Sequence, residues 1–304
     1  MLPEQSSPTL PSEAALPDVV AVAAGTRTRR HLGLGAWVAI GWLVLVIALA
    51  VLAPILPIPK PTEIVDHGAL RDAKPSLSHL LGGDSNSYDV LSRVIWGARN
   101  SLAVGFFAVA LGGTAGGFLG LIAGYYRGRI ETLITALLDI MLAFPALVLA
   151  LALTTFLGHS VFYVSLALGI ISTPILARIT RANTLTWSQR EFVTAARAQG
   201  AKNRRIIVRE VLPNVVPAMA SIALLAVAVV IVAEAGLSLL GAGLASDVPS
   251  WGNIINFGRN DLTNGTAPHI VFSGSGAILF TVLSLNYLGD VVRARFDVKE
   301  GALV

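Results

Sequence analysis

Only a few residues of this 304-residue chain have a type and setting that could support chemistry. Three acids lie within or at the ends of long apolar runs, namely Asp139, Glu234 and Asp290. A charged side chain is costly inside a membrane, so each of these is a candidate functional residue. The alternative is a position near an interface, where the carboxylate bonds to Ser, Asn or backbone groups. No chain of acids and histidines crosses these runs, which disfavours a proton relay.

Other kinds of reactive site are missing from the sequence. The chain has no cysteine, which excludes disulfides, thiol catalysis and cysteine-bound zinc or iron–sulfur clusters. It has no G-x-x-x-x-G-K-S/T phosphate loop, no G-x-S-x-G elbow and no H-E-x-x-H pair. Its histidines are scattered and predict no metal site: His31, His67, His79, His159 and His269. We therefore expect a conduit and not an enzyme, with no cofactor in this chain.

The composition indicates what positions the acids. Hydrophobic residues make up 54% of the chain and charged residues 13%, whereas a soluble domain is about a quarter charged. A bilayer core needs about 20 apolar helical residues. The uncharged runs predict an all-α polytopic membrane protein with six spans: 34–56, 101–123, 133–157, 161–179, 217–240 and 270–290.

Basic residues predict the orientation of these spans. With both termini in the cytoplasm, 16 of the 22 basic residues lie inside and six lie outside, as the positive-inside rule requires. The chain then divides into a disordered cytoplasmic tail (1–30), an N-terminal span with an external loop (31–100), a core (101–295) and a C-terminal tail (296–304). We expect the plasma (inner) membrane as its location.

The cytoplasmic loop 180–213 within this core predicts two short helices joined by an elbow. Ser188 and Glu191 have the spacing of a capping box, and Trp187 and Phe192 that of a hydrophobic staple. Gly200 can end the first helix in a left-handed conformation. A second helix is expected from 202 to 211, with Pro213 starting the next span. The physics leaves two interpretations open: an amphipathic hairpin on anionic lipid, or a docking element for a cytoplasmic partner.

This loop resembles the EAA loop of ABC importer permeases. The resemblance lies in the run E-F-V-x-A-A-R-A-x-G-A from Glu191 to Ala201, followed by Leu212-Pro213-Asn214. Two positions depart from the motif: Thr194 stands where Glu is frequent, and Glu210 where Ile is frequent. The first of these runs is similar to the pattern of the dipeptide/oligopeptide/nickel branch.

Three further segments resemble the same branch, and together the similarity covers about residues 80 to 295. They are 81–102, 234–243 and 249–253. In the first, Ser87-Tyr88 replaces a usual Gly-Arg and Gly83 replaces a usual Thr. The order of the segments and the extra N-terminal span resemble the "C" permease of such importers, with a type I importer fold.

The resemblance implies a set of partners and a coupling site. The partners are a second homologous permease, ATP-hydrolysing subunits (two chains or one fused chain) that hold ATP and Mg, an external solute-binding protein and membrane lipid, with no nucleic acid. The loop would be a coupling helix in a groove of the ATPase, with small residues that allow close approach. Its expected coupling residues are Glu191, Phe192, Thr194, Ala195, Ala196, Arg197, Gly200, Ala201 and Arg205. For Glu234, which lies in a resembling segment, we favour a structural role.

Glycines recur every four residues in the second span. Gly112, Gly116, Gly120 and Gly124 form a groove along one helix face, the small-xxx-small pattern of close helix packing. Two uses are open: packing inside this chain, or contact with the second permease.

The external segment after the fifth span carries the run Pro249, Ser250, Trp251, Gly252 and Asn253. We expect it to meet the binding protein or to shape the outer gate. The alternative is a membrane anchor, because Trp favours that interface in any membrane protein.

Three function classes are weighed. A peptide importer permease explains the loop, with nickel chelates or another small solute as alternative cargo. A secondary transporter predicts inverted repeats around a midplane site, and no convincing repeat occurs. An intramembrane enzyme needs catalytic polar pairs that the sequence lacks.

Overall fold

The computed structural model describes residues 33–65 and 70–300, and the predicted tail 1–30 lies outside this range. Helices account for nearly all the regular structure, with a single isolated bridge between Gly83 and Asp89 in the described part. Their order is α1 (Leu34–Leu52), α2 (Val90–Tyr126), α3 (Gly128–Leu142), α4 (Ala146–Leu157), α5 (Val161–Ser188), α6 (Glu191–Ala198), α7 (Asn203–Ile206), the π-helical turn η3 (Ile207–Val211), α8 (Leu212–Leu239), α9 (Trp251–Asn264) and α10 (Pro268–Glu300).

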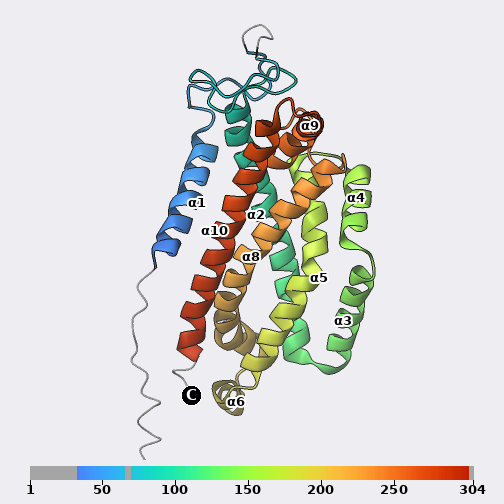
Figure 1. The fold of residues 1–304 in the computed structure, drawn as a ribbon. Coiled ribbons are helices and arrows are strands. Elements are labelled where there is room, and N and C mark those ends of the chain that lie inside the picture. Colours follow the sequence, from blue (N-terminus) through green and yellow to red (C-terminus); the bar gives the residue numbers. More distant parts are fainter. Residues whose placement is uncertain (1–32, 66–69, 301–304) are drawn as a thin grey trace, which may run out of the picture. The chain divides into compact units, whose positions relative to one another are not determined.

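Five of the described helices are long and apolar enough to cross a membrane, and the bent pair α3–α4 makes a sixth if it is one span. The all-α polytopic prediction is confirmed. Figure 1 shows the long helices running side by side, with α6 at one end and α9 and the loop between α1 and α2 at the other. We call these the α6 end and the α9 end.

Several helices extend beyond the predicted spans. Helix α2 begins at Val90, eleven residues before the predicted span, since Asp89 caps it by accepting a bond from the Ser92 N–H at 2.7 Å. Helix α5 continues past 179 to Ser188. Helix α10 reaches Glu300, so the predicted tail begins as helix. Polar residues extend a helix wherever caps or packing support them.

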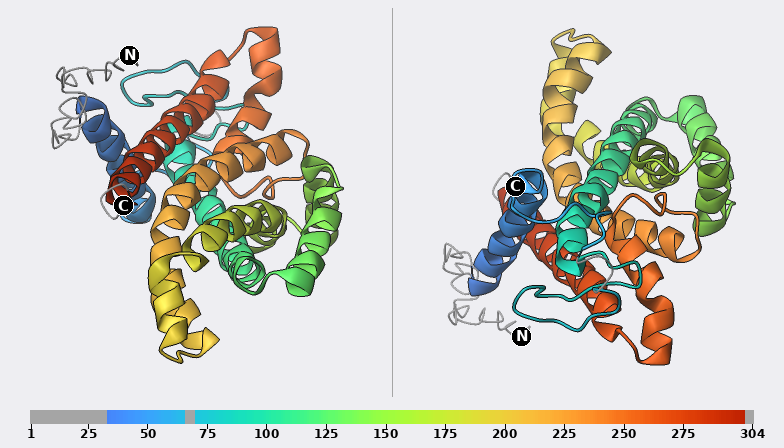
Figure 2. Two further views of the ribbon diagram at one scale, coloured as in Figure 1. Left: turned by 90° about the horizontal axis from the view of Figure 1, so that it is seen from below. Right: turned by 90° about the horizontal axis from the view of Figure 1, so that it is seen from above.

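The predicted span 133–157 is broken. Helices α3 and α4 meet at an angle of 81°. Pro145 precedes α4, and proline disfavours helical backbone in the residue before it. Figure 2 shows this pair as a separate arm beside α5, on the opposite side of the bundle from α1 and α10. Only Leu138, Ala150 and Thr154 are buried along its two helices.

Two apolar clusters hold the helices together. The larger one joins α1, α2, α4, α5, α8, α9 and α10, with Trp251 and Ile231 among its fully buried members. The smaller one lies at the α6 end and contains seven buried residues: Leu121, Tyr125, Trp187, Val193, Ile206, Val211 and Val215. The loop that carries α6 is therefore packed onto the ends of the spans.

Candidate functional site: the α6 loop and the contacts behind it

Helix α6 ends on the elbow that the sequence predicts. Gly200 has a φ of +80°. The Gly200 N–H donates to the Arg197 carbonyl at 3.0 Å, and the Ala201 N–H donates to the Ala196 carbonyl at 3.1 Å. This is the Schellman arrangement, in which a left-handed residue directs two N–H groups back onto the last turn. The chain thus leaves α6 in one fixed direction.

The start of α6 differs from the prediction. Because α5 runs on to Ser188, the N-cap of α6 is Arg190, which makes no side-chain cap bond. Ser188 Oγ donates instead to the Leu185 carbonyl at 3.0 Å, so the predicted capping box does not form. Trp187 and Phe192 do lie together, with ring centroids 6.3 Å apart.

The elbow leads directly into the fifth span. Residues from Asn203 to Leu239 form one helical run that passes through the π-turn at Ile207–Val211. The Leu212 N–H donates to the Ile207 carbonyl, five residues back. Pro213 then lies in the first turn of α8, where its missing N–H costs little, as the sequence predicts. Helices α7 and α8 are thereby continuous, and the elbow 199–202 joins α6 to them.

Val193 is the one fully buried side chain of α6. Val193 is fully buried against the second cluster, and Ala196 and Ala201 pack partly against it. Full burial of such an aliphatic side chain is worth about 1.5–3 kcal/mol. Tyr125 adds a polar tie, since its hydroxyl donates to Asn203 Oδ1 at 3.0 Å.

Most of the expected coupling residues are exposed on the surface. Glu191, Phe192, Thr194, Ala195, Arg197, Gly200 and Arg205 are exposed, while Ala196 and Ala201 are half-buried. Ala196 packs partly against the chain's own cluster, and its contact with a partner stays a prediction. Ala195 is the small residue that is open to a partner.

The four-residue glycine stripe faces α5. A Cβ atom at Gly112, Gly116 or Gly120 would lie 2.7, 2.5 or 2.3 Å from a backbone carbonyl oxygen of α5. Gly124 is as tight, at 2.7 Å from Thr184 Cβ. The stripe is thus used for packing inside this chain. Gly117, on another face of α2, has nothing within 4 Å.

At the α9 end, Glu234 and the segment 249–253 form one cluster. Glu234 is fully buried and accepts bonds from Ser250 at 2.9 Å, Ser238 at 3.0 Å and Ser101 at 3.4 Å. Ser101 in turn accepts the Trp251 N–H at 3.1 Å. Three elements, α2, α8 and α9, are joined through one carboxylate.

The segment 249–253 is an internal clamp. All five residues are buried, and Trp251 is 1% exposed, so the alternative of an exposed aromatic anchor does not describe this tryptophan. Ser250 caps α9, an element that the sequence analysis missed. Asn253 Nδ2 donates to the carbonyls of Leu244, Ala245 and Val248. Contact with a binding protein stays a prediction, and this burial argues against a direct one.

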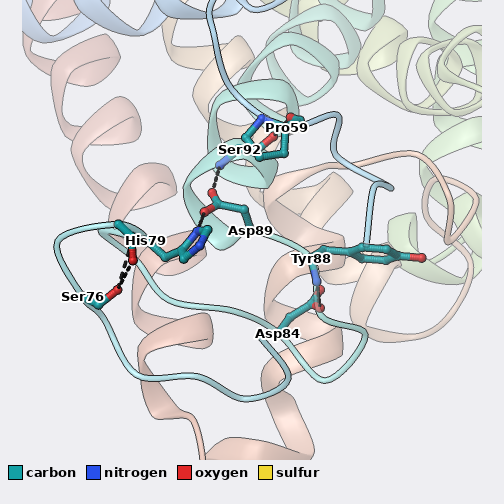
Figure 3. Close-up of polar contacts among 8 residues, drawn as sticks. Pro59, Ser76, His79, Asp84, Tyr88, Asp89 and Ser92 are labelled. Carbon is teal, nitrogen blue, oxygen red and sulfur yellow. Dashed lines mark hydrogen bonds and ion pairs between the residues drawn. The ribbon is translucent and has the colours of Figure 1, made fainter. Parts of the chain in front are cut away.

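The loop between α1 and α2 is tied to the start of α2 by buried charged groups, and Figure 3 draws three of them, Asp84, Asp89 and His79. Asp84 pairs with Arg93 at 2.5 Å and also accepts the N–H groups of Asn86 and Tyr88 at 2.9 Å. Asp89 accepts from His79 Nδ1 at 2.8 Å. Ser87, at the position where the related motif carries Gly, has a φ of +62°, which explains why glycine is usual there.

Two of the three candidate acids are exposed. Asp290 lies on the surface of α10. Asp139 pairs with Arg178 of α5 at 2.5 Å, with both side chains 53% exposed. The sequence analysis did not name Arg178 or the neighbouring pair of Arg181 with Glu131. Nowhere in the described ranges do three or more metal-binding side chains gather.

These features define a multi-pass inner membrane permease. Residues 116–299 match the family model described as "Binding-protein-dependent transport system inner membrane component", and the chain belongs to that family. It is thus a permease subunit of an ABC importer and not itself an enzyme.

Individual relatives sharpen the comparison. The glutathione transport system permease protein GsiD of Pectobacterium atrosepticum is 36% identical over 89% of this chain and 88% of its own length. The dipeptide transport system permease protein DppC of Alkalihalophilus pseudofirmus is 38% identical over 83% and 82%. Among solved structures, a chain of the inward-facing MetNI methionine ABC transporter matches 67% of this chain and 95% of its own length. Its TM-score is 0.56 at 20% identity, which supports the fold.

Proposed function

We propose that the chain is the "C"-type permease of an ATP-driven peptide importer and that α6 is the element on which an ATPase subunit docks. A second homologous permease completes the pathway, and an external binding protein delivers the peptide. Both termini then face the cytoplasm, on the side of the α6 end. The peptide cargo is supported by the names of the glutathione and dipeptide relatives.

One observation carries the proposal. Helix α6 is held on one face by Val193 and fixed at its end by Gly200, while its other face presents the exposed Ala195 and Arg197. A helix held in this way can transmit a force from a bound ATPase, because it is displaced as a unit and does not bend. Its elbow passes the displacement to α8 through the continuous helical run from Asn203.

Reconstitution tests this function. The chain is co-expressed with its neighbouring permease, ATPase and binding-protein genes, and the complex is placed in proteoliposomes. We expect ATP-dependent uptake of glutathione or of the dipeptide Ala-Phe when the binding protein is present. Uptake of a nickel–histidine chelate in place of both peptides would instead support the alternative cargo. Uptake of any solute without an ATPase would contradict the proposal.

A further inference from the structure

We propose that the segment from Lys202 to Arg209, which joins the elbow to α8, binds the headgroups of anionic phospholipids. Four residues form the basic cluster of this segment: Lys202, Arg204, Arg205 and Arg209. Helix α6 stays the surface offered to the ATPase, so the two halves of the loop have different partners. The proposal goes beyond the proposed function and does not depend on its cargo.

The basic cluster has no partner within the described chain. All four side chains are exposed. Within residues 33–65 and 70–300 none of them forms an ion pair or a side-chain hydrogen bond. Glu210 is the one acid between Glu191 and Glu234 in the sequence. Four like charges in eight residues repel one another, and an anionic partner relieves that repulsion.

One helix face leads from the basic cluster into the membrane span. Residues Asn203–Leu239 form a single helical run. Exposed side chains recur along it every three or four residues, a spacing that keeps them on one face: Arg205, Arg209, Pro213, Val216 and Ala220. The face is basic up to Arg209 and apolar from Pro213 onward. This change is expected where a span passes from hydrocarbon into the headgroup layer.

The other side of the same run is fixed against the chain itself. Ile206, Val211 and Val215 are fully buried in the smaller apolar cluster. The exposed face carries Val208 and Val216, each of them 52% exposed, and Val208 lies among the bases. An apolar side chain among bases suits the boundary between headgroups and acyl chains, where both kinds of surface find partners. Figure 1 shows α6 farther from the spans than the start of α8.

A phospholipid accounts for both the charged and the apolar part of this face. Guanidinium groups bind phosphate through paired N–H donors, and clusters of four to eight bases beside a span attract anionic headgroups. The run from Val211 to Ala233 is uncharged and 23 residues long, enough to cross a bilayer core, so the basic cluster lies at its edge. Acyl chains can cover Val208 and Val216, which a free phosphate cannot do.

A fluorophore beside the basic cluster tests the proposal. The chain has no native cysteine, so Val208→Cys introduces a single thiol into this subunit. The thiol carries an NBD group, and the full complex, with partner subunits made cysteine-free, is placed in lipid nanodiscs. We expect spin-labelled phosphatidylglycerol to quench NBD at least threefold more strongly than spin-labelled phosphatidylcholine at the same mole fraction. Salt at about 0.5 M should reduce the difference, because it screens exposed charges.

Paired variants separate the basic cluster from general charge attraction. In Arg204→Gln/Arg209→Gln the two lipids should quench equally, and Arg205 is left unchanged because it is also an expected coupling residue. The matched control Arg127→Gln/Arg129→Gln removes two exposed bases from the turn between α2 and α3 and should keep the preference. Equal quenching by the two lipids in the starting complex, or loss of the preference in both double variants, would overturn the proposal.

A protein on this face would give a different result. If the ATPase or the second permease covered it, NBD at position 208 would be quenched by neither lipid and would be protected from iodide in solution. That outcome would assign the basic cluster to a protein contact and refute lipid binding.

Melting of the complex gives a test without a fluorophore. Since a ligand of the folded protein stabilises it, dioctanoyl phosphatidylglycerol should raise the melting temperature of the detergent-purified complex by at least about 2 °C. Dioctanoyl phosphatidylcholine should not. The rise should be absent in Arg204→Gln/Arg209→Gln, whose melting without lipid shows that it is folded. An equal rise with inorganic phosphate would show a simple anion site and would contradict the lipid assignment.

Discussion

Helix α5 meets two of its neighbours, α2 and α3, through different kinds of contact. Against α2 it packs backbone to backbone, with room for no more than hydrogen at three successive glycines. Against α3 it makes two ion pairs, and Leu138 is the only buried residue of α3. Close-packed backbones cannot slide without steric overlap, whereas ion pairs in contact with water can exchange partners. We infer that α2 and α5 form one rigid contact.

The α2–α5 pair connects the α6 end of the helix bundle with its α9 end. At the α6 end, Tyr125 of α2 and Trp187 of α5 belong to the cluster that holds Val193. At the α9 end, Ser101 of α2 bonds to Glu234 and Trp251. A displacement of α6 can therefore reach the clamp 249–253 through two routes, the α2–α5 pair and the continuous α7–α8 helix.

The largest expected effect comes from breaking the glycine contact. Gly120→Leu places a side chain where a Cβ atom alone would be 2.3 Å from the Ala177 carbonyl oxygen. We expect no folded complex to be recovered after detergent extraction and size-exclusion chromatography. Gly117→Leu, three residues away on an open face, should give a normal complex. Recovery of both variants in equal yield would show that the α2–α5 contact is not required.

Removal of the buried carboxylate should have the next largest effect. Glu234→Ala leaves three hydroxyl donors without their acceptor and opens a cavity, a cost of about 3 kcal/mol. We expect a clearly lower melting temperature of the purified complex. The exposed Asp290→Ala is the control and should change stability by less than about 0.5 kcal/mol. Equal melting of the two variants would contradict a structural role for Glu234.

A smaller effect on stability, but a large one on transport, is expected at the elbow. Gly200→Val disfavours the φ of +80° and should misdirect the chain after α6, while Gly200→Asn tolerates that conformation. We expect the Val variant to assemble and hydrolyse ATP with at least tenfold less uptake per ATP. The Asn variant should retain most of the coupling. Normal uptake in the Val variant would remove the elbow from the transport mechanism.

The smallest effect on stability should come from the α3 side of the comparison. The double variant Asp139→Asn/Arg178→Gln removes a half-exposed pair, and such pairs contribute about 0–1 kcal/mol. We expect its melting temperature to match that of wild type within about 2 °C, the scale set by that energy. A large drop would mean that α3 is locked to α5, which would remove the contrast between the two contacts.

Sequence spacing predicted the structural features that depend only on residues close together in the sequence. Gly200 and the glycine repeat were identified from spacing, and the cap Ser250 with Gly265 after α9 would have revealed that helix as well. The capping box failed because α5, in which Thr184 and Trp187 are buried, continues up to Ser188 and makes it the last helical residue. The contact of Glu234 with Ser101 joins residues 133 positions apart. No periodicity predicts such a contact, since it arises only when α2, α8 and α9 pack together.

The central claim is that α6 is the docking site of the ATPase, and neighbouring alanines test it most directly. Ala195 is exposed and Ala196 is half-buried against the chain's own cluster. Each is replaced singly by cysteine, and the labelling rate is measured with and without bound ATPase. We predict that position 195 labels rapidly in the permease pair and at least tenfold more slowly with ATPase bound, while position 196 labels slowly in both. Unchanged labelling of position 195 in a complex that contains the ATPase would contradict the claim.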